Sequence, residues 1–384
     1  MVKARTGRNT AAMKILFRTI VALLLIATAG GIFAAYQLSR TSPCPADQSS
    51  ALLVAPEGKT MMAVRQHCYG PPSSLVYAPV PRPAPGPGEL LVRVHAAGVN
   101  PLDWHTMRGS PYLMRLGSGF GAPDESRFGV DFSGVVSEVG SGVTRFKVGD
   151  RVFGGATGAF AEFLLVRENQ AISLVPEGIS HQQAAAVAIA GLTALQALRD
   201  KGQLQAGQKV LINGASGGVG SFAVQLARHL GAEVYGVSST RNVRRVLALG
   251  AQRVFDYTRE SYLDSDELFD LIVDMVGNHS PLANTAALTP GGRLVIVGGP
   301  SGDWLGPVTG PLLAMLSKPF VDQEMVILLA QLNSADLDTM AELMDTGAVT
   351  PLLDSRYPLA EYAAALTHSE TGRARGKIIL DIHP

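Results

Sequence analysis

A glycine-rich turn at residues 213–220 narrows the choice of fold more than any other stretch of this chain. Residues 209–213 (KVLIN) read as an apolar strand. Residues 219–230 read as an amphipathic helix, with Phe222 and Leu226 on one face. Glycines let the backbone turn tightly and approach a pyrophosphate, and the helix start offers free N–H groups and a positive dipole end. The pattern predicts a dinucleotide site inside a βαβ unit.

The expected adenosine end of this site favours NADPH over NADH. An NAD site places Asp or Glu about 20 residues after the turn, to hold the ribose 2′-hydroxyl. This chain has Ser239 and Arg241 there, which are a hydroxyl donor and a guanidinium suited to a 2′-phosphate. The residues predicted to contact the dinucleotide through the turn are Gly214, Ala215, Ser216, Gly217, Gly218, Val219 and Gly220.

The rest of the chain divides into two parts that differ in their expected secondary structure. From Met62 onward, short β-like runs such as 90–95, 134–139 and 160–166 alternate with Gly/Pro turns. After residue 180, strands alternate with helices, which predicts an α/β fold with a parallel sheet covered on both faces. The final run, 377–382, reads as a strand that rejoins the β-rich part. Formal net charge is zero, so nothing indicates a nucleic-acid partner.

The first 60 residues read as a separate extension. Residues 20–38 form an uncharged apolar run of 19 residues, which as a helix would be about 28 Å long, close to a bilayer core of ~30 Å. Five basic residues precede it, and no acidic residue occurs before Asp47. We predict a transmembrane helix at 20–38 and a single-pass membrane location. A cleaved secretory signal, an organellar presequence and a buried core helix are the alternatives.

The orientation of such an anchor stays open. The positive-inside rule places the basic residues in the cytosol and the main part of the chain outside, away from cytosolic NADPH. Translation starting at Met61 or Met62 would instead give a cytoplasmic protein. Cys44 and Cys68 would pair if that region lay outside the cell, and would otherwise be free thiols.

Several motifs reveal a family resemblance. They are residues 97–104 (AGVNPLDW), 129–134 (GVDFSG), 147–152 (KVGDRV), 190–194 (AGLTA), the dinucleotide turn and 288–292 (LTPGG). In order and spacing they resemble the medium-chain dehydrogenase/reductase superfamily. The likeness is greatest to its zinc-independent quinone oxidoreductase (zeta-crystallin-like) branch and the related alkenal/enone reductases.

The resemblance implies a GroES-like catalytic domain with an inserted Rossmann domain. We expect the N-terminal extension to cover 1–60, the GroES-like domain 61–180 and 320–384, and the Rossmann NADP-binding domain 181–319. The resemblance also implies that further residues lie near the cofactor. They are Tyr257, Gly298, Arg375, Gly376 and Lys377. Relatives are often dimers, so a homodimer is an expectation for this chain.

Positions that hold zinc in the alcohol dehydrogenases of this superfamily carry other residues here. Asn100 stands in place of a cysteine, and Val130 and Asp131 stand in place of a His-Glu pair. We therefore expect no metal. Without a Lewis acid, hydride transfer suits substrates that accept hydride readily, such as quinones and α,β-unsaturated carbonyls.

Asn100 and His105 are the predicted catalytic residues. The Asn100 amide offers N–H donors to a developing oxyanion, unless it is only a turn residue before Pro101. His105 would donate a proton near neutral pH, unless it is an exposed loop residue. Asp103 is expected to cap or orient this loop. The leading hypothesis is an NADPH-dependent reductase acting on a small quinone or enone. The alternatives are a membrane-tethered, non-catalytic NADPH-binding protein and a zinc-free NADP-dependent alcohol dehydrogenase.

Overall fold

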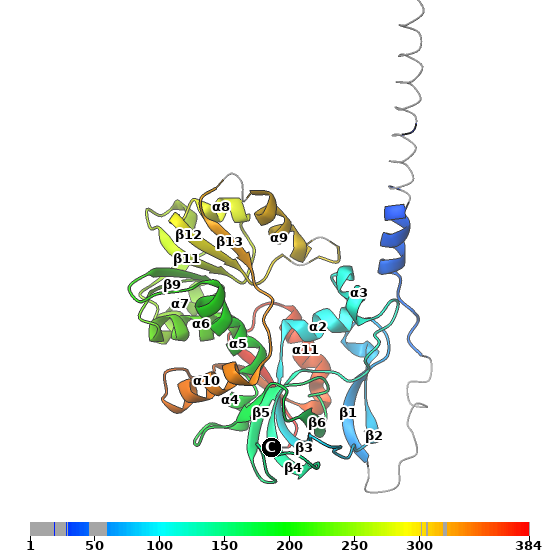
Figure 1. The fold of residues 1–384 in the computed structure, drawn as a ribbon. Helices are drawn as coiled ribbons and strands as arrows, with labels where there is room; N and C mark the ends of the chain where they lie inside the picture. Colours follow the sequence, from blue (N-terminus) through cyan, green and yellow to red (C-terminus); the bar gives the residue numbers. More distant parts are fainter. Residues whose placement is uncertain are drawn as a thin grey trace, which may run out of the picture.

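A β-rich domain and a parallel α/β domain lie side by side in the computed structural model (Figure 1). The structure describes residues 19, 28, 30–45, 60–300, 302–304, 306–317 and 321–383. Two large apolar cores of buried residues correspond to the two domains.

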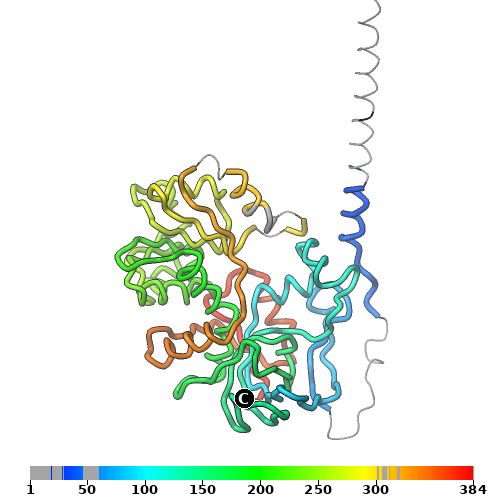
Figure 2. The backbone as a smooth tube through the Cα atoms, viewed as in Figure 1, coloured from blue at the N-terminus to red at the C-terminus, as the bar shows by residue number. Residues whose placement is uncertain are grey.

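The β-rich domain is built on a mixed sheet, in which β14 and β15 pair in parallel and the other neighbours are antiparallel. The order is β14-β15-β3-β4-β5-β7, and β6 pairs with β3. The bounds are β3 Glu89–Val99, β4 Asp131–Val139, β5 Arg151–Gly155, β6 Phe163–Arg167, β7 Ile172–Leu174, β14 Leu353–Pro358 and β15 Lys377–Asp381. A separate hairpin pairs β1 (Thr60–Gln66) with β2 (Leu75–Pro81). Figure 2 shows the red C-terminal segment running among the cyan and green strands, so the expectation that 377–382 rejoins this part is confirmed.

Short helices cover this sheet. The α-helices are α2 Pro101–Arg108, α3 Arg115–Ser118 and α11 Tyr362–Glu370, and the 3-10 turns are η1 Pro72–Ser74, η2 Tyr112–Met114 and η7 Leu359–Glu361. Helix α11 packs against both α2 and η1. The helix that follows β3 is therefore held between the sheet and the C-terminal part of the chain.

The second domain has a six-stranded sheet in which every pair of neighbours is parallel. Its order is β10-β9-β8-β11-β12-β13, so the strand order reverses between β8 and β11. The bounds are β8 Lys209–Asn213, β9 Glu233–Ser238, β10 Arg253–Asp256, β11 Phe269–Asp274, β12 Leu288–Ile296 and β13 Glu324–Ile327. In open α/β sheets, ligands bind beyond the carboxyl ends of the strands at such a reversal. Strand β13 lies beyond residue 319, where the sequence analysis places the end of this domain.

Helices flank the parallel sheet (Figure 1). They are α5 Ala188–Gln196, the π-helical turn η3 Ala197–Lys201, α6 Gly218–His229, α7 Val243–Leu249, α8 Pro281–Thr285 and α9 Gly306–Ser317, with 3-10 turns η4 Thr240–Asn242 and η5 Tyr262–Asp264. Helix α4 (His181–Ala184) packs against β3 and β4 of the other sheet, and α10 (Ser334–Asp345) packs against β7 and α5. Helix α6 buries Phe222 and Leu226 in the core, as its periodicity predicts. The glycine turn therefore opens a helix that is packed tightly against its own sheet.

The N-terminal segment corrects one prediction. Within the described residues, no helix has the length and apolar character needed to cross a bilayer. The predicted single-pass membrane location is therefore wrong, and the predicted membrane partner has no support among the described residues. Residues 20–27 and 29 of the predicted span lie outside the described part.

The segment after this helix is attached to the β-rich domain. Thr41 forms a bridge with Gly121, and the Ser42 N–H donates to the Gly121 carbonyl at 2.7 Å. A disulfide joins Cys44 to Cys68, which answers the question that the sequence left open. The buried Arg115 side chain donates to the carbonyl of Leu38 at 2.8 Å. This part of the extension thus belongs to the folded body.

Candidate functional site

The glycine turn after β8 forms a cradle that larger residues would fill. Gly214 has φ +92°, in the left-handed region that favours glycine. A Cβ on Gly220 would lie 2.1 Å from the Gly214 carbonyl oxygen, so only glycine fits there. Gly217 is the N-cap of α6, and no side chain among the described residues caps this helix start. The free N–H groups and open space fit a dinucleotide pyrophosphate.

The adenosine end is organised by a residue that the sequence analysis missed. Asn242 is buried, and its Nδ2 donates to Ser216 Oγ at 3.1 Å and to Ser239 Oγ at 3.3 Å. Its Oδ1 is buried and has no hydrogen-bond partner among the described residues. One amide therefore ties the turn to the serine after β9. Arg241, in η4, donates to the carbonyl of Arg373 at 3.4 Å.

A carboxylate, that of Asp256, also lies near the adenosine end, on the strand next to β9. Asp256 ends β10 and lies opposite Ser238 in the sheet register. It accepts hydrogen bonds from Thr240 Oγ1 at 2.5 Å and Thr258 Oγ1 at 2.8 Å. The hydrogen bond from Thr240, with others from Thr258, lowers the pKa of Asp256 despite some desolvation. The residue spacing of NAD sites places the acid at the end of the second strand, so that spacing gives no signal for an acid at the end of β10.

The other predicted cofactor residues lie next to strand ends. The exposed Tyr257 follows β10, and its N–H donates to the Ser238 carbonyl at 3.1 Å. Gly298 follows β12, and a Cβ there would lie 2.3 Å from the Met275 carbonyl oxygen. Arg375 donates its backbone N–H to Asp354 Oδ1 at 2.9 Å.

Gly376 and Lys377 lie directly against the dinucleotide turn. A Cβ built on Gly218 would meet Lys377 Cδ at 3.2 Å and the Gly376 carbonyl oxygen at 3.7 Å. Ala215 is fully buried beneath the turn, and the partly buried Val219 packs on the core. The predicted turn residues and the late 375–377 stretch therefore come together, although the sequence separates them by more than 150 positions.

Asn100 lies where β3 ends and α2 begins, inside a buried polar cluster. Its Oδ1 accepts a hydrogen bond from the Lys377 ammonium. Lys377 also forms an ion pair with Asp131, at 3.3 Å between Nζ and Oδ2. The other Asp131 oxygen accepts the N–H of Ile189 at 3.0 Å. Burial raises the pKa of Asp131, while the Lys377 charge and the Ile189 N–H oppose that rise. Because an ammonium already lies against these side chains, a divalent cation would face a like charge there.

Asp103 orients the loop, as expected. Its Oδ2 accepts the backbone N–H of Asn100 at 2.7 Å, which fixes the start of α2. Burial raises the pKa of Asp103 to about 7, and the bond from the Asn100 N–H opposes the rise. Val130 precedes β4 next to Asp131. Among the described residues, no group of three or more His, Cys, Asp or Glu side chains is arranged to hold a metal ion.

His105 lies further along α2 and is partly buried. Its ring stacks on Trp104 with centroids 3.6 Å apart. Its Nδ1 lies 2.7 Å from the Ser110 carbonyl oxygen, which can only accept, so Nδ1 carries the proton. Burial lowers the pKa of His105, and the bond to Ser110 opposes this. Near neutral pH the ring is therefore mostly uncharged, with its one N–H committed to Ser110.

Comparisons with known proteins match this architecture. A family model described as "Alcohol dehydrogenase GroES-like domain" matches residues 86–177, and one described as "Zinc-binding dehydrogenase" matches residues 249–380. A chloroplast envelope quinone oxidoreductase homolog from Arabidopsis thaliana is 34% identical over 343 residues, which cover 84% of this chain and 99% of that protein.

Solved structures agree with the sequence comparisons. The quinone oxidoreductase from Coxiella burnetii gives a TM-score of 0.75 at 30% identity, over 84% of this chain and 100% of that one. A mycobacterial structure complexed with NADPH gives a TM-score of 0.70 at 27% identity, over 84% of this chain and 100% of that one. The chain is therefore an oxidoreductase enzyme that belongs to the zinc-independent quinone oxidoreductase branch of the medium-chain dehydrogenase/reductase superfamily.

Proposed function

We propose that this protein uses NADPH to reduce quinones or α,β-unsaturated carbonyls without a metal ion. The observation that carries the proposal is the position of the Asn100 amide beside the dinucleotide turn. The Lys377 stem passes Gly218, and its ammonium reaches the Asn100 side-chain oxygen. A dinucleotide cradle and a buried amide donor are thus joined by one side chain.

The proposed reaction divides the work between cofactor and protein. When bound, NADPH supplies a hydride. Reduction of an enone at its β-carbon moves the C=C π electrons toward the carbonyl, which leaves negative charge on the oxygen. The Asn100 N–H groups would donate to that oxygen and stabilise it. A proton then adds at the α-carbon. We assign this proton to water, because His105 is uncharged near neutral pH and its N–H is bound to Ser110.

The preference for NADPH is supported by a hydroxyl and a guanidinium at the adenosine end. Ser239 and Arg241 lie beside Asn242, where a 2′-phosphate would be accommodated. Asp256 opposes this preference, but its oxygens are occupied by Thr240 and Thr258. The relative solved with NADPH is consistent with the assignment. A zinc-free alcohol dehydrogenase is the second candidate, since the same cradle would bind NADP⁺.

The test is turnover by the purified full-length protein. We expect NADPH oxidation with a quinone or alkenal panel, and deuteride from labelled NADPH should appear at the β-carbon of the saturated product. Arg241→Ala should weaken NADPH binding about tenfold, since hydrogen bonds to charged groups contribute about 1.5–3 kcal/mol, and leave NADH binding unchanged. Arg244→Ala, on the exposed face of α7, is the matched control. NADPH binding without turnover of either substrate class would refute the proposal, and NADP⁺ reduction by alcohols alone would favour the second candidate.

A further inference from the structure

A buried lysine connects the cofactor cradle to the candidate oxyanion donor. Lys377 is only 3% exposed, and its stem lies against Gly218 in the dinucleotide turn. Its ammonium contacts Asn100 Oδ1 and Asp131 Oδ2. A buried lysine is uncommon in proteins unless its charge is paired. The contacts place this residue between the two halves of the proposed reaction site.

The backbone holds Lys377 in this place. Strand β15 pairs with β3 with Ile378 opposite Val99, so the next position along the register sets Lys377 beside Asn100. Gly376 has φ +121°, and a Cβ there would lie 2.5 Å from the Leu352 carbonyl oxygen. The Lys377 N–H donates to the same carbonyl at 2.8 Å. A glycine and a sheet register together therefore aim the lysine side chain inward.

Asp131 holds the ammonium charge in the core. Its side chain is fully buried, and its second oxygen accepts the Ile189 N–H in the first turn of α5. An unpaired charged carboxylate in the core costs free energy. Without the ammonium of Lys377, Asp131 would be such a carboxylate. The ammonium has three N–H donors, and Asp131 and Asn100 account for two of them.

The cation determines which way the Asn100 amide faces. Because its oxygen is bound by the ammonium, the amide cannot turn that oxygen toward a substrate. One Nδ2 hydrogen of Asn100 is directed to Asp131, a hydrogen bond that lowers the pKa of that carboxyl. The other has only a long contact, 3.4 Å to the Gly98 carbonyl, so one N–H remains for a substrate. A cation on the amide oxygen also polarises the group and strengthens its N–H as a donor.

We propose that Lys377 is a positioning residue: it holds Asn100 by the side-chain oxygen so that the N–H not bound to Asp131 faces the substrate oxygen that gains charge. This rests on the proposed reduction of quinones or enones. In that reaction, the hydride adds to the substrate carbon, the π electrons move to oxygen, and water later supplies the proton. Lys377 keeps all its protons throughout.

The first experiment is a double-mutant cycle in the full-length enzyme. Lys377→Met keeps the stem and removes the charge, and it should lower kcat about 10- to 100-fold, the range for residues that orient catalytic groups. In an Asn100→Ala background, Lys377→Met should lower kcat less than about threefold, because the amide that Lys377 positions is absent. NADPH affinity, measured by fluorescence, should change less than about threefold. Lys201→Met, at an exposed position on η3, is the matched control.

The second experiment reads oxyanion binding without turnover. 4-Nitrophenol presents a phenolate oxygen, and its visible absorbance reports ionisation. The wild type should favour the bound phenolate, and Lys377→Met should lose this preference to the same degree as Asn100→Ala. The pair Lys377→Met/Asp131→Asn removes both charges, so no unpaired buried charge remains to unfold the protein.

The outcomes separate the two proposals. Wild-type turnover with Lys377→Met as active as Lys201→Met would overturn the role of the lysine and leave the proposed function standing. The role of the lysine would also be overturned if the losses of kcat in the cycle were additive. The same holds if Lys377→Met binds the phenolate as the wild type does. A wild type that binds NADPH but reduces no quinone or enone would overturn the proposed function itself, and the inference with it.

Discussion

Residues 100–105 show that close neighbours in sequence have different tasks in the fold. Asp103 is expected to cap or orient its loop, and the structure begins helix α2 there, with Asp103 bound to the Asn100 N–H. The partner of the Asn100 side chain is Lys377, 277 positions away. No local pattern links these two residues. Short-range bonds could therefore be predicted, and the contact that orients the amide could not.

Asp103 should make stability depend on pH in a defined direction. Burial raises its pKa from 3.8 to about 7, so the folded state retains a proton that the unfolded state releases. Its contribution to stability therefore falls as pH rises between those values. Asp103→Asn removes this titration and keeps an oxygen to accept the Asn100 N–H. The melting temperature of Asp103→Asn relative to wild type should rise across that window.

The control for Asp103 is Asp264→Asn, an exposed position on η5. Thermal unfolding followed by circular dichroism at several pH values gives the comparison. If the difference between Asp103→Asn and wild type does not vary with pH, Asp103 does not titrate in the window that its burial implies.

At the scale of elements, the sequence predicts the regular strands but not the points at which a helical region is interrupted. The strand expected at 209–213 matches β8, and the strand expected at 377–382 corresponds to β15, Lys377–Asp381. The helical region that begins after residue 180 is divided into α4, α5 and η3. The division lies where the Ala185 carbonyl would meet a Cβ on Gly98 at 2.3 Å. Packing against β3 therefore ends α4 at a point where helix propensity alone would continue the helix.

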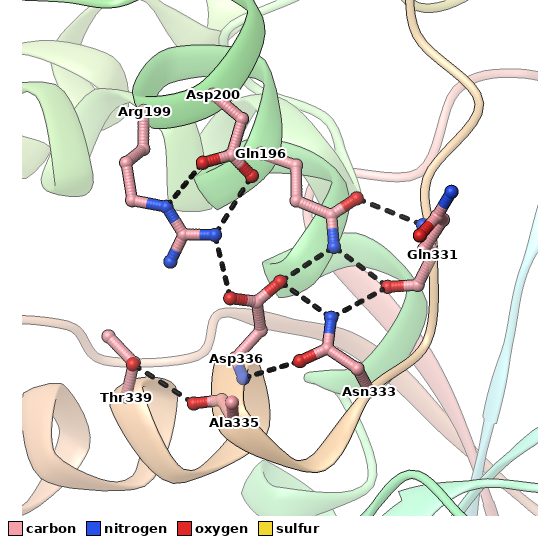
Figure 3. A network of polar contacts seen from close by, with 8 residues as sticks. All are labelled: Gln196, Arg199, Asp200, Gln331, Asn333, Ala335, Asp336 and Thr339. Carbon is pink, nitrogen blue, oxygen red and sulfur yellow. Dashed lines mark hydrogen bonds and ion pairs between the residues drawn. The ribbon is translucent and has the colours of Figure 1, made fainter.

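A polar network joins α5 and η3 to the start of α10 (Figure 3). Asp336 accepts from Gln196 Nε2 at 2.7 Å, Arg199 Nη2 at 2.7 Å and Asn333 Nδ2 at 2.8 Å. Burial alone would raise its pKa, but the bonds from Asn333, Gln196 and Arg199 outweigh this and lower it. The network attaches the helix that follows β13 to the core helix in front of β8.

Asp336→Ala should therefore loosen this junction. It leaves buried donors without an acceptor, and we expect a loss of about 2 kcal/mol in the free energy of unfolding, limited by the exposure of Arg199. Asp336→Asn should lose less, because its oxygen still accepts. Urea unfolding measures both, with Asp345→Asn at the exposed end of α10 as control. Equal stability of Asp336→Ala and the control would contradict the assigned role.

At the scale of the molecule, the two domains touch across the edge where the glycine turn lies. Ser110 Oγ donates to Asp303 Oδ1 at 2.7 Å, and the Tyr112 N–H donates to the Asp303 carbonyl at 2.7 Å. The Tyr112 and Trp304 rings meet edge to face, with centroids 4.8 Å apart. Asp303 follows β12, so it leaves the sheet at its carboxyl edge, where the turn after β8 also lies.

We expect this contact to help close the site. Asp303→Ala should raise KM for the acceptor about 3- to 10-fold, which corresponds to one net hydrogen bond of about 0.5–1.5 kcal/mol. The melting temperature should stay unchanged, because the contact lies between domains. Glu370→Ala, which breaks the Arg108 ion pair within the β-rich domain, is the control. A fall in stability without a change in KM would show that the contact is only structural.

The sequence by itself determined the local features of this protein. Strand periodicity, the glycine turn and the helix that follows it depend on neighbours a few residues apart, and such interactions are visible in the order of residues. Among the described residues, the tertiary structure has no helix long and apolar enough to cross a membrane. It also joined Cys44 to Cys68 and placed Lys377 between the cofactor cradle and Asn100. Those outcomes depend on which distant segments pack together, and burial then sets which charges must pair.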